Sequence, residues 1–246
     1  GIIQPGRIGD VLIVLPIAKW YHDLGYTVYW PIVSEYLSLF DYVNYVHAID
    51  IGSGLANAYI RSKDVLKEKE IPALIDLGIG FGKNESEPSS SGLSFDEGKY
   101  KEANVPFRDR FNLLIHRNHK RELELEQQLR FDGLLKSGKS YSITHSVGTK
   151  GKVDFGVSNS IEISPILGFT IFDWIGLIER SDHVYCVDSC VAHLVNQLGL
   201  AKGRRTFKPL SNYHGRSLEM AVPKIDWEAE DSPTISKSSF ELSTVL

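Results

Sequence analysis

The stretch Asp173–Leu200, DWIGLIERSDHVYCVDSCVAHLVNQLGL, decides the fold of this 246-residue chain. Apolar residues recur at helical spacing through its first third, and the β-prone run His183–Val187 follows them. Asp188–Ser189 is a helix start signal, and Gly199 is a stop signal. A strand that leads into a helix N-terminus leaves backbone N–H groups and the positive end of the helix dipole available to an anion. We therefore expect a phosphate site at this turn.

The N-terminal sequence is the second informative stretch. Ile2–Gln4 predicts the end of a strand, and Pro5–Gly9 predicts a glycine-containing loop that is not of the GxGxxG type. Asp10 is placed as the N-cap of a helix that ends near Leu24. Pro16 lies inside that helix and predicts a kink or a tight first turn, because it removes one backbone hydrogen bond.

Strands and helices alternate along the rest of the chain, which predicts an α/β fold with a parallel sheet. The Gly- and Ser-rich segment Gly78–Gly92 is either a mobile loop near a ligand or an inert surface insertion. The polar tail from Ser211 is expected to be loosely ordered towards its end. Further strands are expected at 27–32, 42–49, 73–77, 140–146, 157–164 and 204–207, and helices at 34–40, 61–70 and 119–135, the last with Leu123 and Leu129 facing inward.

Composition excludes several classes of protein. A net charge of −4 argues against a broad nucleic-acid surface, since such proteins are usually basic. Two cysteines in a chain of this length indicate no disulfide framework and favour a reducing, cytoplasmic location. No apolar run is as long as the roughly 20 residues of a transmembrane helix. The sequence begins at Gly1, without a signal peptide or an initiator methionine.

The two informative stretches together resemble the family-9 glycosyltransferases of the lipopolysaccharide heptosyltransferase type. Those enzymes begin with a strand, a loop ending in Gly-Asp and a helix reading roughly GDVLLTLP, and they carry a D-S/T-G-x-x-H-L turn near the C-terminus. Cys190 stands here where the family has glycine, and the chain is shorter than is usual for the family. The matching residues are Gly9, Asp10, Leu15 and Pro16, then Asp188, Ser189, His193 and Leu194.

The resemblance implies a GT-B fold, in which two Rossmann-like parallel-sheet domains face a central cleft. The N-terminal domain, placed at residues 1–136, would bind the acceptor, and the C-terminal domain, at 137–246, the nucleotide sugar. Inverting, metal-independent transfer to a hydroxyl acceptor such as a glycan or lipopolysaccharide is expected. The nucleotide sugar is a co-substrate, and no cofactor is expected. Peripheral association with a membrane is left open.

Asp10 is the expected catalytic residue, because the matching family aspartate acts as the base that takes the acceptor proton. The alternative is a plain helix cap. A helix dipole lowers the pKa of an aspartate, so we expect Asp10 to be ionised. Gly9 and Arg7 belong to the loop expected on the acceptor side. No DxD motif binds a metal here, and His116 and His119 lack partner ligands for a metal site.

The expected donor site is centred on Ser189, whose helix N-terminus and hydroxyl would bind the leaving diphosphate. Cys190 and His193 follow on the same helix, and His193 is otherwise a satisfied interior histidine. Ser146 and Lys150 match a hydroxyl-then-lysine pattern that contacts phosphates in the heptosyltransferases. Lys152 competes with Lys150, and Glu162 and Thr170 are weaker candidates near the nucleotide base.

Two other functions remain open. A non-catalytic Rossmann-type protein that recognises a nucleotide or a sugar phosphate would keep the Ser189 site without transferring a sugar. A glycosyltransferase that modifies nucleic acid would use the same fold, although the acidic net charge makes a nucleic-acid partner unfavourable.

Overall fold

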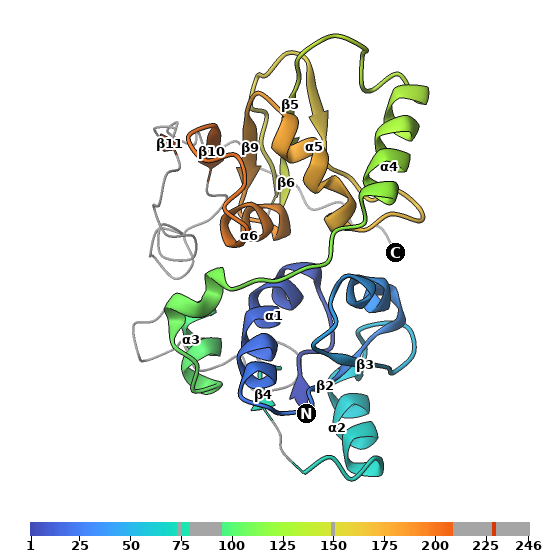
Figure 1. Ribbon diagram of the computed structural model, residues 1–246, viewed down its shortest axis with the longest axis vertical. Coiled ribbons are helices and arrows are strands. Elements are labelled where there is room, and N and C mark those ends of the chain that lie inside the picture. The colour runs from blue at the N-terminus through green and yellow to red at the C-terminus, as the bar shows by residue number, and fades with distance from the viewer. Residues whose placement is uncertain (73–74, 79–94, 149–150, 209–227, 230–246) are drawn as a thin grey trace, which may run out of the picture.

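The computed structural model describes residues 1–72, 75–78, 95–148, 151–208 and 228–229. The described elements form two groups, one stacked on the other (Figure 1). The predicted loop 78–92 lies outside the described residues except for Gly78, as do Lys150 and, apart from a two-residue strand, the tail from Ser211. No helix among the described residues combines the length and the apolar character that a membrane crossing requires.

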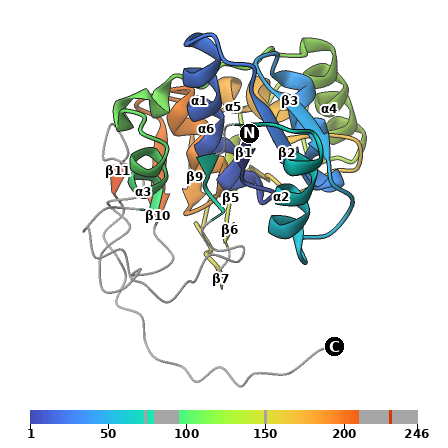
Figure 2. The same ribbon diagram turned by 90° about the horizontal axis from the view of Figure 1, so that it is seen from below.

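The N-terminal group contains short parallel strand pairs and the helix α1. Strand β1 pairs with β4, and β2 pairs with β3. Seen from below, α3 lies on one side of α1, and the strands with α2 lie on the other (Figure 2). The bounds are β1 Ile2–Ile3, α1 Ile8–Asp23, β2 Tyr29–Ile32, 3-10 helix η1 Ser34–Tyr42, β3 His47–Asp50, α2 Ala58–Glu68, β4 Ile75–Asp76, α3 Phe95–Glu102 and 3-10 helix η2 Phe107–Phe111.

The second group contains a five-stranded parallel sheet in the order β11-β10-β9-β5-β8. The helix predicted from Asp188–Ser189 is present, and it follows the predicted strand directly. The predicted α/β class with parallel sheets is confirmed. The bounds are α4 His119–Phe131, β5 Ser142–His145, the antiparallel pair β6 Val147–Gly148 and β7 Gly151–Lys152, β8 Ser160–Glu162, 3-10 helix η3 Ile171–Trp174, α5 Ile175–Arg180, β9 Val184–Val187, α6 Cys190–Gln197, β10 Arg205–Lys208 and β11 Glu228–Ala229.

Helix α1 begins earlier than the sequence predicted. Its N-cap is Arg7, which has a φ of 63°, and Asp10 lies in the first turn. The left-handed backbone at Arg7 turns the chain into the helix directly after Gly6, where a Cβ atom would meet Leu55 at 2.3 Å. The prediction that Asp10 caps the helix is therefore wrong, although its carboxylate still faces the positive end of the dipole.

Pro16 lies inside α1, and the helix continues past it to Asp23. Because proline has no backbone N–H, the carbonyl of Leu12 loses its partner within the helix. Gln197 of α6 supplies the missing donor, with its Nε2 2.9 Å from the Leu12 oxygen. A buried side-chain amide thus satisfies the carbonyl and joins the two groups of elements.

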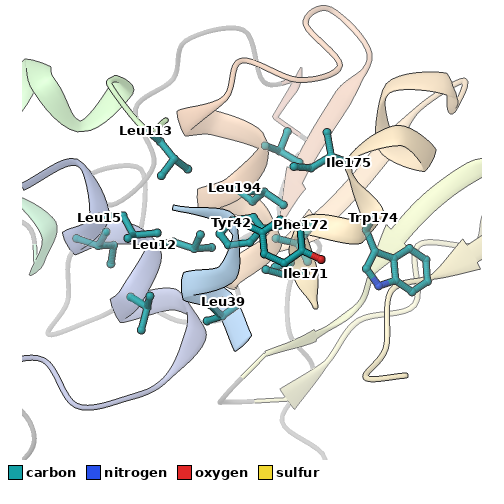
Figure 3. Packing of buried hydrophobic residues seen from close by; sticks show 14 of the residues in the cluster. Leu12, Leu15, Leu39, Tyr42, Leu113, Ile171, Phe172, Trp174, Ile175 and Leu194 are labelled. Atoms are coloured by element: carbon teal, nitrogen blue, oxygen red, sulfur yellow. The ribbon is translucent and has the colours of Figure 1, made fainter. Parts of the chain in front are cut away.

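The apolar core runs through both groups. Residues Val11 to Ala18 of α1 are all buried, as expected of a helix that is covered on every side. Figure 3 shows leucines of α1 beside Leu194 of α6, and Tyr42 beside Phe172. The rings of Tyr42 and Phe172 are 5.2 Å apart between centroids, so η1 and η3 also pack across the junction.

Helix α4 packs against α5 and η3 of the second group. Leu123 is 55% exposed, so its predicted inward orientation is wrong, and Leu125 and Leu129 face the core. Glu122 is buried because Arg117 binds both of its oxygens at 2.7 Å. The domain boundary at residue 136 stays a prediction.

Candidate functional site

The N-termini of α1 and α6 meet at the junction between the two groups. A Cβ atom placed on Gly9 would lie 3.9 Å from both Cα and Cβ of Cys190, and equally far from Cδ2 of His193. The two motifs singled out in the sequence, which are far apart along the chain, are therefore neighbours in space. Figure 1 shows α6 directly above the first turn of α1. Two helix N-termini that lie close together favour the binding of an anion near them.

Asp10 is almost buried, with its side chain 11% exposed, and Lys99 of α3 faces it. Nζ of Lys99 lies 3.5 Å from Oδ1 of Asp10. The same ammonium donates hydrogen bonds to Oε1 of Gln4 at 2.5 Å and to the carbonyl of Leu77 at 2.8 Å. The Asp10 carboxylate is therefore paired with an ammonium group whose position is fixed by two other hydrogen bonds.

Burial raises the pKa of Asp10, and the charge of Lys99 opposes that rise without cancelling it. The expectation that the helix dipole lowers this pKa is therefore wrong, because loss of solvent outweighs the dipole at this depth. A raised pKa makes the carboxylate a stronger base than an exposed aspartate.

A second buried carboxyl group belongs to Asp96, also on α3. Its Oδ2 lies 3.7 Å from Nδ1 of His193, so α3 and α6 touch at this point. Burial raises the pKa of Asp96 to about 7, and burial lowers the pKa of His193. At neutral pH the contact therefore joins an imidazole that is mostly neutral to a carboxyl group that is protonated more readily than an exposed aspartate. His193 lies beside Gly9 and Asp96, and its predicted role in donor binding stays a prediction.

Ser189 is the N-cap residue of α6, but its side chain makes no capping hydrogen bond. Its Oγ is buried and has no hydrogen-bond partner within the described part of the chain. The hydroxyl therefore has hydrogen-bonding capacity that the described residues leave unused. Next to it, burial raises the pKa of the Cys190 thiol to about 11, so the thiol is neutral at neutral pH.

Ser146 lies at the same edge of the sheet, because β5 and β9 run parallel with His145 opposite Cys186. Its N–H and its Oγ donate to Oε1 of Glu162 at 2.7 and 2.8 Å. Thr144 donates to the other oxygen of Glu162 at 2.6 Å. Burial disfavours ionisation of Glu162, yet these hydrogen bonds bring its pKa below the ordinary value. Ser146 as a phosphate ligand stays a prediction, since Glu162 already holds its hydroxyl.

The other predicted residues lie around this centre or apart from it. Arg7 is exposed beside the first turn of α1, where its charge favours ionisation of Asp10. Lys152 is exposed on β7. Thr170 forms a capping box with Asp173 at the start of η3. Lys150 lies outside the described residues.

Sequence reasoning missed Lys99 and Asp96. The buried positions of α3 are Asp96, Lys99 and Tyr100, and with the buried Ala103 just after the helix they follow the i, i+3, i+4, i+7 pattern of a core-facing helix. Two of these four positions carry charge. Charged residues in the apolar register of a helix were the signal that could have identified them.

Two surface cavities border neither Asp10 nor Ser189. One of about 260 Å³ lies at the far end of α1, beside Tyr45 and His47. The other, of about 220 Å³, lies between η1 and η3 and is lined by Ser38, Asp41, Tyr42, Asn118, Arg121, Gly168 and Thr170. The guanidinium group that lines it is already hydrogen-bonded within the protein, since Arg121 donates to Tyr42, to Asp173 and to the carbonyl of Gly168. Within the described ranges, no group of His, Cys, Asp or Glu is arranged to hold a metal ion.

Comparison with known proteins yields one similar fold. No protein-family model matches the chain, and no curated protein matches it in sequence. The solved structure of a glycosyl transferase of family 9 from Veillonella parvula DSM 2008 matches with a TM-score of 0.55 and 10% identity, over 85% of this chain and 84% of that chain. At this identity the similarity shows the fold alone. The chain thus has the fold of a family-9 glycosyltransferase structure, while the heptosyltransferase type and the two-domain GT-B arrangement stay predictions.

Proposed function

We propose that this protein is a glycosyltransferase of the GT-B type that moves a sugar from a nucleotide-sugar donor to a hydroxyl acceptor. The observation that carries the proposal is the close approach of Gly9, the residue next to Asp10, to Cys190 and His193 in the first turn of α6. Glycosyl transfer needs a base on one side of the anomeric carbon and an anion site on the other. The fold shared with a family-9 glycosyl transferase structure supports the same conclusion.

In this mechanism Asp10 accepts the proton of the acceptor hydroxyl. The acceptor oxygen then forms a bond to the anomeric carbon, and the bond from that carbon to the diphosphate oxygen breaks. The electron pair of the broken bond leaves with the nucleoside diphosphate. A single displacement of this kind inverts the configuration at the anomeric carbon.

The leaving diphosphate would bind at the start of α6. Backbone N–H groups of the first turn and the hydroxyl of Ser189 supply hydrogen bonds there, and the helix dipole supplies positive potential. The neutral thiol of Cys190 adds no negative charge that would repel the phosphates. Acceptor binding is assigned to the side of Arg7 and Gly9, next to the base.

The proposal is tested by donor binding and by transfer. Nucleoside diphosphates and nucleotide sugars are screened for a rise in melting temperature, since a ligand in excess of its Kd stabilises the folded state. Wild-type protein and Asp10→Asn are then assayed for transfer to hydroxyl acceptors. Donor binding in both proteins with transfer lost in the variant supports the proposal. Equal transfer by the two proteins would remove Asp10 from the mechanism.

The arrangement of Asp10 also suits a second function, that of a non-catalytic protein which binds a nucleotide or a sugar phosphate. The cation of Lys99 compensates the carboxylate, so the pair could serve only the stability of α1. Such a protein would bind the same nucleotides at Ser189. It would neither hydrolyse a nucleotide sugar nor transfer its sugar to any acceptor in the assay above.

A further inference from the structure

Lys99 is fully buried, and its side chain reaches the site from α3. Burial of an ammonium group is costly unless an opposite charge compensates it. Its two hydrogen-bond acceptors, Oε1 of Gln4 and the carbonyl of Leu77, are both neutral. The ring of Phe95 lies 4.6 Å from Nζ and adds a weaker attraction. The compensating charge therefore comes from carboxylates, and Asp10 forms an ion pair with Lys99.

We propose that Lys99 is a positioning residue for Asp10, which keeps this buried carboxylate ionised and fixed beside the N-terminus of α6 until it accepts a proton. The proposal rests on the function proposed above, in which Asp10 is the base. Lys99 itself touches neither donor nor acceptor. Its hydrogen bonds to the residues that follow β1 and β4 hold the ammonium at one place, so the direction of the ion pair is fixed as well.

The balance of burial and charge explains why Asp10 needs this cation. Burial alone would leave the carboxyl group protonated to a higher pH, and a protonated group cannot accept a proton. Lys99 is the largest opposing influence on the pKa of Asp10. In turn, burial lowers the pKa of Lys99, and the charge of Asp10 counters this. The other titratable and charged groups that face the pair are Arg7, Tyr36, Asp96, Glu102 and His193.

A purely structural role for Lys99 would make a different prediction. If the lysine only ties α3 to the ends of β1 and β4, its replacement lowers stability and leaves the titration of Asp10 unchanged. If it positions Asp10, its replacement moves that titration. Stability measurements do not separate the two roles, whereas the titration of one carboxyl group does.

The experiment is a ¹³C NMR titration of side-chain carboxyl groups in the full chain, without any substrate. The Asp10 signal is assigned by its loss in Asp10→Asn. In Lys99→Met, whose folding is checked by circular dichroism, we expect the Asp10 midpoint to rise by about one to three pH units. Lys101→Met, on an exposed position of the same helix, is the matched control and should leave the midpoint in place. An unchanged midpoint in folded Lys99→Met overturns the proposal.

A reciprocal measurement serves if Lys99→Met does not fold. Coupling between two groups acts equally in both directions, so Asp10→Asn should lower the ¹⁵Nζ titration midpoint of Lys99 by a similar amount. An unchanged Lys99 midpoint overturns the proposal. Failure of the proposed function is distinguishable, because wild-type protein would then transfer no sugar while these midpoints still report on the ion pair. Where transfer is found, the acid limb of kcat in Lys99→Met should move to higher pH.

Discussion

The two helix N-termini that meet at the candidate site differ in the ionisable side chains that surround them. On the side of α1, ionisable groups are buried together: Asp10 forms an ion pair with Lys99, whose charge also lowers the pKa of the Asp96 carboxyl group. On the side of α6, the helix begins with the unpartnered hydroxyl of Ser189 and the protonated thiol of Cys190, and Asp188 is the charged residue just before them. The difference indicates a division of labour. The first side suits proton transfer, and the second suits an anion held by backbone dipoles.

The largest effect should follow from removal of the charge on the first side. Asp10→Asn keeps the shape of the side chain and removes the base, so we expect kcat for sugar transfer to fall by about 10²- to 10⁴-fold. Nucleoside diphosphate binding, measured by calorimetry, should stay within a few-fold of wild type. A comparable loss of donor affinity would contradict the division between the two sides.

Because of Asp96, the free energy of unfolding should decrease as the pH rises, whereas an ion-paired aspartate with a lowered pKa makes it increase. Its pKa is raised from 3.8 to about 7 in the folded state, so the folded protein binds more protons than the unfolded chain within that window. The stabilisation by this proton is complete below pH 3.8 and is lost as the pH rises to about 7.

Relative to Asp96→Asn, the wild-type free energy of unfolding should therefore fall by about 4 kcal/mol across this window. Urea unfolding of both proteins at several pH values measures the difference. Glu97→Gln, at the neighbouring position of α3, is the control. A constant difference between wild type and Asp96→Asn would show that Asp96 ionises normally.

Removal of the hydroxyl on the second side should weaken the anion site alone. Ser189→Ala loses one hydrogen bond to a charged phosphate, so we expect the Kd of a nucleoside diphosphate to rise about tenfold. Ser160→Ala, at an exposed position of β8, should leave it unchanged. Unaltered affinity in Ser189→Ala would mean that the anion binds elsewhere.

The last prediction concerns the hydrogen bond that joins the two sides. Gln197→Ala leaves the carbonyl of Leu12 without a donor, which should cost about 1–3 kcal/mol of stability. In a Pro16→Ala background the helix regains a backbone N–H for that carbonyl, so the same change should cost less. Additive losses in this double-mutant cycle, measured by urea unfolding, would contradict the explanation.

The sequence predicted the parts of the molecule that depend on local patterns. The strand and helix of 184–197 were found because their apolar periods and their start and stop residues are local signals. The pairing of the two motifs across the molecule was suggested by the resemblance to a family. That these two motifs form a functional site stays a prediction.

The remainder required tertiary information. Asp10 was misplaced as a cap because the left-handed backbone of Arg7, a residue without preference for that region, begins the helix early. The pKa of Asp10 was misjudged because burial cannot be read from a first-turn position. Lys99 was missed because a lysine in a helix usually faces solvent, and only the surrounding packing turns it inward.

The proline of α1 also affects how α1 and α6 are positioned against each other. The hydrogen bond from Gln197 to the carbonyl of Leu12 fixes the position of α6 along α1, because sliding either helix along its axis would separate the amide from the carbonyl. Leu12 follows Asp10 by half a turn, and Gln197 lies roughly 12 Å along its helix from Ser189. The separation between Asp10 and Ser189 is thus set in part by a hydrogen bond that involves neither of them. A substitution at Gln197 would therefore change the spacing of these two residues without replacing either.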